Sequence, residues 1–176
     1  MPNAEKIVTA IYAALEKGQD ESPRAHLGAS IIGRPCARQT WYSFRWAKEI
    51  HHEGKLLRIF RRGHLEEEQF VADLRAAGIT VADKTKANEQ FSFKTIGGHF
   101  GASLDAVAKV EEENWCVLEF KTMNAKAFNA VWNDGVQVSK PEHFAQMQCY
   151  IHLARDIDPE LDAALYLTVC KDDDRI

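Results

Sequence analysis

The sequence predicts an α/β domain in which helices flank a central mixed β-sheet. Helical periodicity fills the first part of the chain, and short segments of alternating hydrophobicity follow before helical and strand patterns return. A chain of 176 residues is long enough to bury a real hydrophobic core. We therefore expect a single domain over residues 1–176.

The first elements are expected to be helices. Apolar residues along one side predict a helix over 4–17. Pro35 is either a breaker or the first residue of a helix that follows it. A longer helix is expected over 55–77, because Gly78 supplies the left-handed residue that commonly follows a helix end.

Strand patterns dominate the second half. The turn residues Gly97 and Gly98 suit a hairpin, and the polar turn 111–114 makes the strands on either side of it antiparallel partners. Pro141 favours a helix start. The expected strands are 79–82, 90–95, 100–110, 115–122 and 163–170, and the expected helices are 125–133 and 142–155.

These elements divide into an N-terminal helical region, residues 1–50, and a core of about 55–170. The last strand runs directly into the acidic end Lys171 to Ile176. Such an abrupt end predicts that the chain is a piece of a longer protein.

Composition narrows the class of protein. No apolar run approaches the roughly 20 residues that cross a bilayer, and the start lacks signal-peptide features, so a cytoplasmic protein without membrane contact is expected. The net charge of −4 argues against a protein coated in basic residues. It leaves nucleic acid open, because phosphate binding needs only a local basic patch.

A carboxylate and a lysine share one face of the strand over 115–122. Side chains alternate along a strand, so Glu119 and Lys121 are neighbours, while Cys116, Leu118 and Phe120 face the core. On the preceding strand, Asp105 is expected to face away from Leu104, Ala106 and Ala108. Antiparallel pairing would bring the two carboxylates to one point.

This arrangement suits a hard divalent cation. Two carboxylates can hold Mg²⁺, which keeps several waters and also binds phosphate oxygens. Such an ion lowers the pKa of a bound water, and the lysine can orient that water or neutralise developing charge. The alternative is an ordinary ion pair between Glu119 and Lys121 at a strand end, which contributes little to stability.

Glu67 strengthens the case for a site. It is expected near the centre of the apolar stripe of the helix over 55–77, with Glu66 and Glu68 turned to solvent. A carboxylate buried there is unfavourable by several kcal/mol unless it is paired or binds a metal (roughly, from). Gly63, one turn earlier, leaves room for a strand or ligand. The stripe contains Leu56, Phe60, Val71 and Leu74.

His64 lies on the same side of that helix as Glu67. Three interpretations stay open for it: a further metal ligand, a phosphate contact, or a histidine packed in the core.

Five segments in this order resemble the PD-(D/E)XK nucleases, in particular the branch that holds RecB- and Cas4-like enzymes and phage recombination exonucleases. The matching segments are Cys36-Ala-Arg-Gln-Thr-Trp-Tyr, Arg62-Gly-His-Leu-Glu-Glu-Glu, Gly101-Ala-Ser-Leu-Asp, Val117-Leu-Glu-Phe-Lys-Thr and Gln146-Met-Gln-Cys-Tyr. The resemblance covers about residues 30–170 and implies a restriction-endonuclease-like core.

The resemblance also implies roles for individual residues. The metal ligands would be Asp105, Glu119 and Glu67, with His64 and the backbone carbonyl of Phe120 as further candidates. The ion would be Mg²⁺ or Mn²⁺. The other catalytic residues would be Lys121, Gln146 and Tyr150. Gln146 and Tyr150 are one helical turn apart and share a face, although packing of that helix on the sheet with Tyr150 half buried explains them as well.

Some members of this branch carry an iron–sulfur cluster on one early and three late cysteines. Cys36 matches the early position, but Cys149 and Cys170 lack the late spacing, so no cluster is expected from these residues. The four cysteines, which include Cys116, are expected to be reduced and mostly buried.

Contacts to DNA must come from local basic groups. The candidates are Arg38, Arg45, Arg61, Arg62 and Lys126. Aromatic residues alternate with arginines over 38–46, and such a segment either stacks on unpaired bases or is an amphipathic packed helix.

Together these observations predict an Mg²⁺- or Mn²⁺-dependent deoxyribonuclease, an exonuclease of phage or bacterial recombination or repair. Its expected partners are DNA and a single-strand annealing or recombination protein. The alternative is a catalytically silent adaptor that keeps the nuclease fold to bind DNA or protein. A small-molecule enzyme has little support, because the sequence holds no Gly-rich phosphate loop and no dinucleotide fingerprint.

Overall fold

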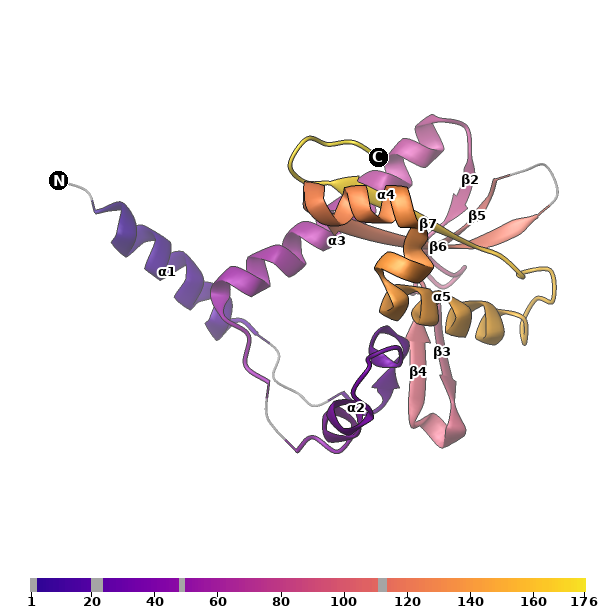
Figure 1. Cartoon of the computed structure of the whole chain (residues 1–176), viewed down its shortest axis with the longest axis horizontal. Coiled ribbons are helices and arrows are strands. Elements are labelled where there is room, and N and C mark those ends of the chain that lie inside the picture. The colour runs from indigo at the N-terminus through magenta and orange to yellow at the C-terminus, as the bar shows by residue number, and fades with distance from the viewer. Residues whose placement is uncertain (1–2, 20–23, 48–49, 111–113) are drawn as a thin grey trace.

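The computed structural model describes residues 3–19, 24–47, 50–110 and 114–176, and it confirms the α/β class (Figure 1). The helices are α1 (Ala4–Lys17), α2 (Ala37–Phe44), α3 (Gly54–Ala76), α4 (Ala125–Ser139) and α5 (Pro141–Ala154), with the 3₁₀ turns η1 (Ala29–Ile31) and η2 (Ile96–Gly98). The strands are β1 (Leu27–Gly28), β2 (Thr80–Ala82), β3 (Ser92–Thr95), β4 (Phe100–Ser103), β5 (Ala106–Lys109), β6 (Trp115–Met123) and β7 (Ala164–Cys170).

The central sheet is mixed and has the strand order β2-β5-β6-β7. Strand β5 is antiparallel to β2 and to β6, as the turn over 111–114 predicts, although residues 111–113 themselves lie outside the described part. Strand β7 pairs with β6 in parallel and places Tyr166 opposite Glu119. Helices α4 and α5 form the crossover between these two parallel strands, as parallel pairing requires.

The expected continuous strand over 100–110 is wrong. It divides into β4 and β5, which belong to different sheets, because β4 pairs with β3 and β1 whereas β5 pairs with β2 and β6. Leu104 therefore does not share a face with Ala106 and Ala108. It packs beside Ala102 on the α5 side, while the two alanines pack beside Phe70 on the α3 side.

Strand β6 is buried on both faces. Cys116, Leu118 and Phe120 pack against α3, as predicted. Val117, on the other face, packs against α5 with Tyr150. A polar residue in the middle of β6 is thus surrounded by protein, whereas Lys121 and Thr122 near its end are only partly buried.

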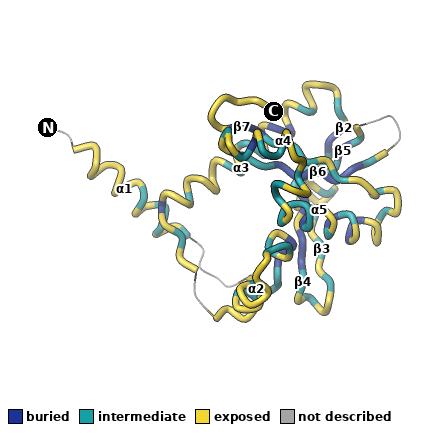
Figure 2. Tube along the Cα trace, viewed as in Figure 1, coloured by how far each residue is buried: buried dark blue, intermediate teal, exposed yellow. Residues whose placement is uncertain are grey.

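Only the second half of α3 packs on the sheet. Phe70 and Val71 are buried, but Leu56 and Phe60 are exposed, so the expectation of one continuous buried stripe is wrong. The first half of α3 extends away from the sheet and meets α1 (Figures 1 and 2). Helix α3 is followed by Gly78 at φ +82°, which confirms the predicted helix end.

The remaining boundaries differ little from prediction. Helix α2 has Cys36 as its N-cap residue, so Pro35 precedes the helix and acts as a breaker. Helix α4 extends beyond 133 to Ser139, because the chain resumes a helical turn after a kink at Gly135. Gly97 and Gly98 have positive φ, as expected for a tight turn. Among the described helices, none is long and apolar enough to cross a membrane.

Candidate metal and catalytic site

Asp105 occupies the point where the chain leaves one sheet for the other. Its Oδ2 accepts a hydrogen bond of 2.8 Å from the backbone N–H of Phe120, one step beyond the Ala106–Leu118 pair that ends the β5–β6 ladder. Burial raises the pKa of Asp105, and the Lys121 charge and the Phe120 N–H oppose that rise. The strand break thus fixes this carboxylate against β6.

Glu119 is the buried charged residue of the described core, with 0% exposure. Its Oε1 forms an ion pair with Nζ of Lys121, as the shared strand face predicts. Burial raises the pKa of Glu119 to about 7; the Lys121 charge opposes the rise, and Asp105 adds to it. The two carboxylates are therefore close enough to interact, as predicted.

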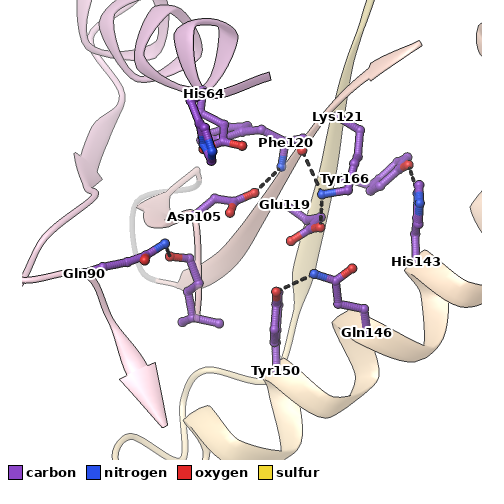
Figure 3. Close-up of polar contacts among 12 residues, drawn as sticks. His64, Gln90, Asp105, Glu119, Phe120, Lys121, His143, Gln146, Tyr150 and Tyr166 are labelled. Carbon is purple, nitrogen blue, oxygen red and sulfur yellow. Dashed lines mark hydrogen bonds and ion pairs between the residues drawn. The ribbon is translucent and has the colours of Figure 1, made fainter. Parts of the chain in front are cut away.

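Lys121 makes a second contact near the site. Its Nζ donates a hydrogen bond of 3.0 Å to the backbone carbonyl of Phe120. The carbonyl considered as a further metal ligand thus already accepts one hydrogen bond from the lysine, whose positive charge lies beside this oxygen. Figure 3 shows the ammonium between this carbonyl and Glu119.

Glu67 lies at the edge of the site. Its side chain is 36% exposed, because it sits where α3 leaves the sheet, and burial followed by the Asp105 charge raises its pKa. The expected burial is therefore only partial. Glu66, expected in solvent, is the less exposed of the two at 27% and pairs with Arg62 at 3.6 Å.

His64 is not a core histidine. Its side chain is 76% exposed, and Nδ1 lies 3.4 Å from Oε2 of Glu67. The interpretations as a metal ligand or a phosphate contact both stay open.

A groove of about 490 Å³ is lined by His64, Glu67, Phe120 and Lys121 of this region. It runs between α3 and the end of β6, and Ser30 of η1 lines it as well. Gly63 lines it too, and a Cβ added there meets no protein atom within 4 Å. Gly63 therefore leaves room for a ligand, one of the two alternatives expected, and no described strand approaches within 4 Å of a Cβ placed there.

Gln146 and Tyr150 lie on the buried face of α5, and Nε2 of Gln146 donates to the Tyr150 hydroxyl. Tyr150 is 3% exposed, so the expectation of a half-buried tyrosine is wrong. Burial and the Glu119 charge raise the pKa of Tyr150. The pair shares one helical face, as predicted, and that face adjoins Glu119 (Figure 3).

Two residues near the site escaped sequence reasoning. The Tyr166 hydroxyl and Nδ1 of His143 form a hydrogen bond of 2.5 Å. Burial and the charges of Lys121 and Lys140 lower the pKa of His143 to about 4. The sequence contains a signal for His143, because it lies three residues before Gln146 and so shares its side of the helix. It contains none for Tyr166, whose position beside Glu119 depends on the register of β6 with β7.

The carboxylates suit a divalent cation in one specific respect. Oε2 of Glu119 is buried and has no hydrogen-bond partner among the described residues. Tyr150 and Asp105 lie near the Glu119 carboxyl and interact with it electrostatically, but neither forms a hydrogen bond with Oε2. A buried unpaired carboxylate oxygen is unfavourable, and a cation would satisfy it.

The complete ligand set is not assembled, however. The described residues contain no group of three or more His, Cys, Asp or Glu side chains arranged to hold a metal. Asp105 and Glu119 therefore stand as a two-carboxylate pair, which is sufficient for Mg²⁺ because that ion keeps several waters.

The basic residues proposed for DNA are exposed. Arg61 and Arg62 line a second groove of about 700 Å³ along α3, and Lys126 lies at the start of α4. Arg38 and Arg45 belong to α2 or its end, and α2 has no buried residue. Thr40, Ser43 and Phe44 share one side of α2 and are partly buried, with the Phe44 ring beside His99, while Arg38, Trp41, Tyr42 and Arg45 are exposed. The segment is therefore an amphipathic helix that packs loosely on one side, and base stacking by its exposed rings stays a prediction.

All four cysteines are free, as expected. Cys116 and Cys170 are buried, Cys149 is partly buried and Cys36 is exposed.

No family model and no curated protein matches the chain. Among solved structures, the one titled "Crystal structure of SSO0001" superposes with a TM-score of 0.54 and 12% sequence identity. The match covers 97% of this chain and 75% of the other. At this identity the likeness shows a shared fold and nothing about activity.

Proposed function

We propose that the protein is a metal-dependent deoxyribonuclease whose active site contains Asp105, Glu119 and Lys121. The observation that carries the proposal is Glu119, which is fully buried, has a free oxygen and lies beside a second carboxylate and a lysine. A carboxylate kept in such an environment without a structural partner suggests a functional site.

In this proposal, Asp105 and Glu119 would hold Mg²⁺ or Mn²⁺, and Glu67 at the groove edge would add negative charge beside them. The bound ion supplies an activated water and stabilises charge on the phosphate. Lys121, whose ammonium lies beside Glu119 and the Phe120 carbonyl, would orient the attacking water and neutralise developing negative charge. Tyr150 and Gln146 hold the wall of the site next to Glu119.

The proposed substrate is DNA. Exposed arginines border the groove system, with Arg61 and Arg62 along α3, and such groups neutralise backbone phosphates. The proposed setting is the cytoplasm of a bacterium or a phage-infected cell, where the enzyme would act from DNA ends in recombination or repair together with an annealing or recombination protein.

End-labelled linear DNA and closed circular DNA test the activity. We expect the wild type to degrade the linear DNA with Mg²⁺ or Mn²⁺, to leave the circle intact and to do nothing in EDTA. Asp105→Ala and Lys121→Ala should lose at least a hundredfold in rate, consistent with loss of an electrostatic catalytic group. Equal cutting by these variants, or no cutting by the wild type, contradicts the proposal.

One observation favours the adaptor alternative. Lys121 bonds both Glu119 and the Phe120 carbonyl, so Glu119 has a counter-charge within the protein without an ion. A crystal soaked in Mn²⁺ separates the two functions, because an adaptor would keep these contacts and show no ion between Asp105 and Glu119.

A further inference from the structure

Helix α2 and its C-terminal end present aromatic rings to solvent. Trp41 is 56% exposed, Tyr42 is 48% exposed and Trp46 is 55% exposed. The rings of Trp41 and Tyr42 meet edge to face, with centroids 5.4 Å apart. We call Arg38, Trp41, Tyr42, Arg45 and Trp46 the α2 platform. Exposed rings that cluster on one surface mark binding sites, whereas single exposed rings are common.

The charged residues around the platform are all positive. Residues 24–47 contain Arg24, Arg34, Arg38 and Arg45 but no Asp, Glu or Lys, while the whole chain carries −4. An arginine-rich aromatic surface on an acidic protein is complementary to a polyanion with flat apolar groups. Nucleic acid has both of these properties.

The platform is fixed to the body of the protein. The Trp46 indole donates a hydrogen bond of 2.8 Å to the Arg24 carbonyl, and the Phe44 ring packs 5.7 Å from the His99 ring. These contacts hold the inner side of the segment. Trp41 and Tyr42 lie outside them, so their rings are available without any rearrangement.

The platform is also within reach of the active-site groove. Ser30 lines that groove, and α2 begins at Ala37, seven residues later. A chain of that length spans at most about 25 Å. Gly33 lets this connection pack closely on α5, because a Cβ there would lie 2.8 Å from the Ala145 Cβ.

We propose that the α2 platform binds unpaired nucleotides of single-stranded DNA, with bases stacked on Trp41 and Tyr42 and phosphates paired with Arg38 and Arg45. The inference rests on the proposed function, because the strand bound on the α2 platform is taken to be the strand that is cleaved in the groove. Base faces in a blunt duplex are covered by their neighbours, so the platform selects single strands or frayed ends over intact duplex.

Binding in EDTA tests the platform without cleavage. The affinity of the chain for a labelled 20-nucleotide oligothymidine is measured beside that for a blunt 20-base-pair duplex. Trp41→Ala and Tyr42→Ala should each weaken oligothymidine binding about tenfold and duplex binding less than twofold. Trp41→Phe should keep most of the affinity. Trp132→Ala, which removes a 76% exposed tryptophan on α4, is the matched control and should bind like the wild type.

Two results overturn the inference. In the first, Trp41→Ala and Tyr42→Ala weaken binding to duplex and to single-stranded DNA equally, which means that the rings do not stack on unpaired bases. In the second, neither affinity changes, which means that this surface binds another class of partner, such as a protein. The cleavage assay is separate. If single-strand binding depends on Trp41 but the protein shows no metal-dependent cleavage, the nuclease proposal is refuted and the α2 platform is supported. If the protein cleaves DNA but Trp41→Ala changes neither cleavage nor binding, the nuclease proposal is supported and the α2 platform is refuted.

Discussion

The Glu119 carboxylate lies inside the central sheet, where its ionised form destabilises the folded protein. The side chain is fully buried on β6, and one of its oxygens has no hydrogen-bond partner among the described residues. Burial favours the protonated form and raises the pKa of Glu119 to about 7. The metal-free protein should therefore be less stable with Glu119 ionised than with it protonated.

The pH dependence follows with a definite sign. In the unfolded chain Glu119 loses its proton near pH 4.5, but in the folded chain it does so only near pH 7. Stability from this group thus falls as pH rises through that window. In EDTA, Glu119→Gln should melt at a higher temperature than the wild type at pH 8, and the difference should shrink toward pH 5.

Thermal denaturation monitored by circular dichroism at both pH values measures this effect. Glu66→Gln, a partly buried carboxylate on α3, serves as control and should show no such trend. A Glu119→Gln protein that is less stable than the wild type at pH 8 contradicts the argument.

His143 should contribute with the opposite sign. Its pKa in the folded protein is about 4, below the ordinary 6.5, so the unfolded chain takes up a proton first as pH falls. The stability from the neutral ring is present above pH 6.5 and is lost between about 6.5 and 4. His143→Gln should therefore lose less melting temperature between pH 7 and pH 4.5 than the wild type does. His152→Gln, an exposed position on α5, should behave like the wild type.

The sequence alone predicts which neighbouring residues of the site lie side by side. Alternation along one strand placed Glu119 beside Lys121, and the helical period paired Gln146 with Tyr150. Glu67 is less buried than its place on the helix predicts, because periodicity shows which residues share a helix face but not how far the sheet extends beneath them. His143 with Tyr166 depends on strand register, which no local pattern encodes.

Helix α3 joins two different environments. Its second half is fixed by the Phe70 ring, which stacks on Phe120 at 5.0 Å, directly beside the site. Its first half leaves the sheet and contacts α1, where Gly54 allows close approach to Tyr12. Gly63, between these halves, faces the groove.

Gly63 offers a test at the scale of the element. Gly63→Ala should stabilise the protein by about 0.5–1 kcal/mol, because alanine favours a helix interior and the added methyl meets no atom. It should nevertheless slow DNA cleavage, because the methyl projects into the groove. Gly78→Ala, at φ +82°, should instead destabilise by about 1 kcal/mol and leave cleavage unchanged. Urea denaturation and the linear-DNA assay measure both effects, and unchanged or faster cleavage by Gly63→Ala contradicts the assignment of the groove.

The strand that divides between the two sheets was not foreseeable from its sequence. Residues 100–110 alternate as one strand would, and nothing in that pattern marks a change of partner at Asp105. The change requires β3 and β1 to be placed first. It is this break that frees the Asp105 side chain to bond Phe120.

At the scale of the whole molecule, the site gathers distant parts of the chain. Helix α3, the β4–β5 break, strand β6 and helix α5 each contribute at least one residue (Figures 1 and 3). The order of helices and strands predicted the α/β class, because each element has its own periodicity. The division into two sheets and the parallel pairing of β6 with β7 arise only from long-range packing.

The central claim is that Asp105 and Glu119 form a metal site, and titration with Mn²⁺ followed by electron paramagnetic resonance tests it most directly. We predict that the wild type binds Mn²⁺, that Asp105→Asn and Glu119→Gln each weaken binding at least tenfold, and that Glu66→Gln binds like the wild type. Equal Mn²⁺ affinity in all four proteins, or no binding by the wild type, would contradict the account.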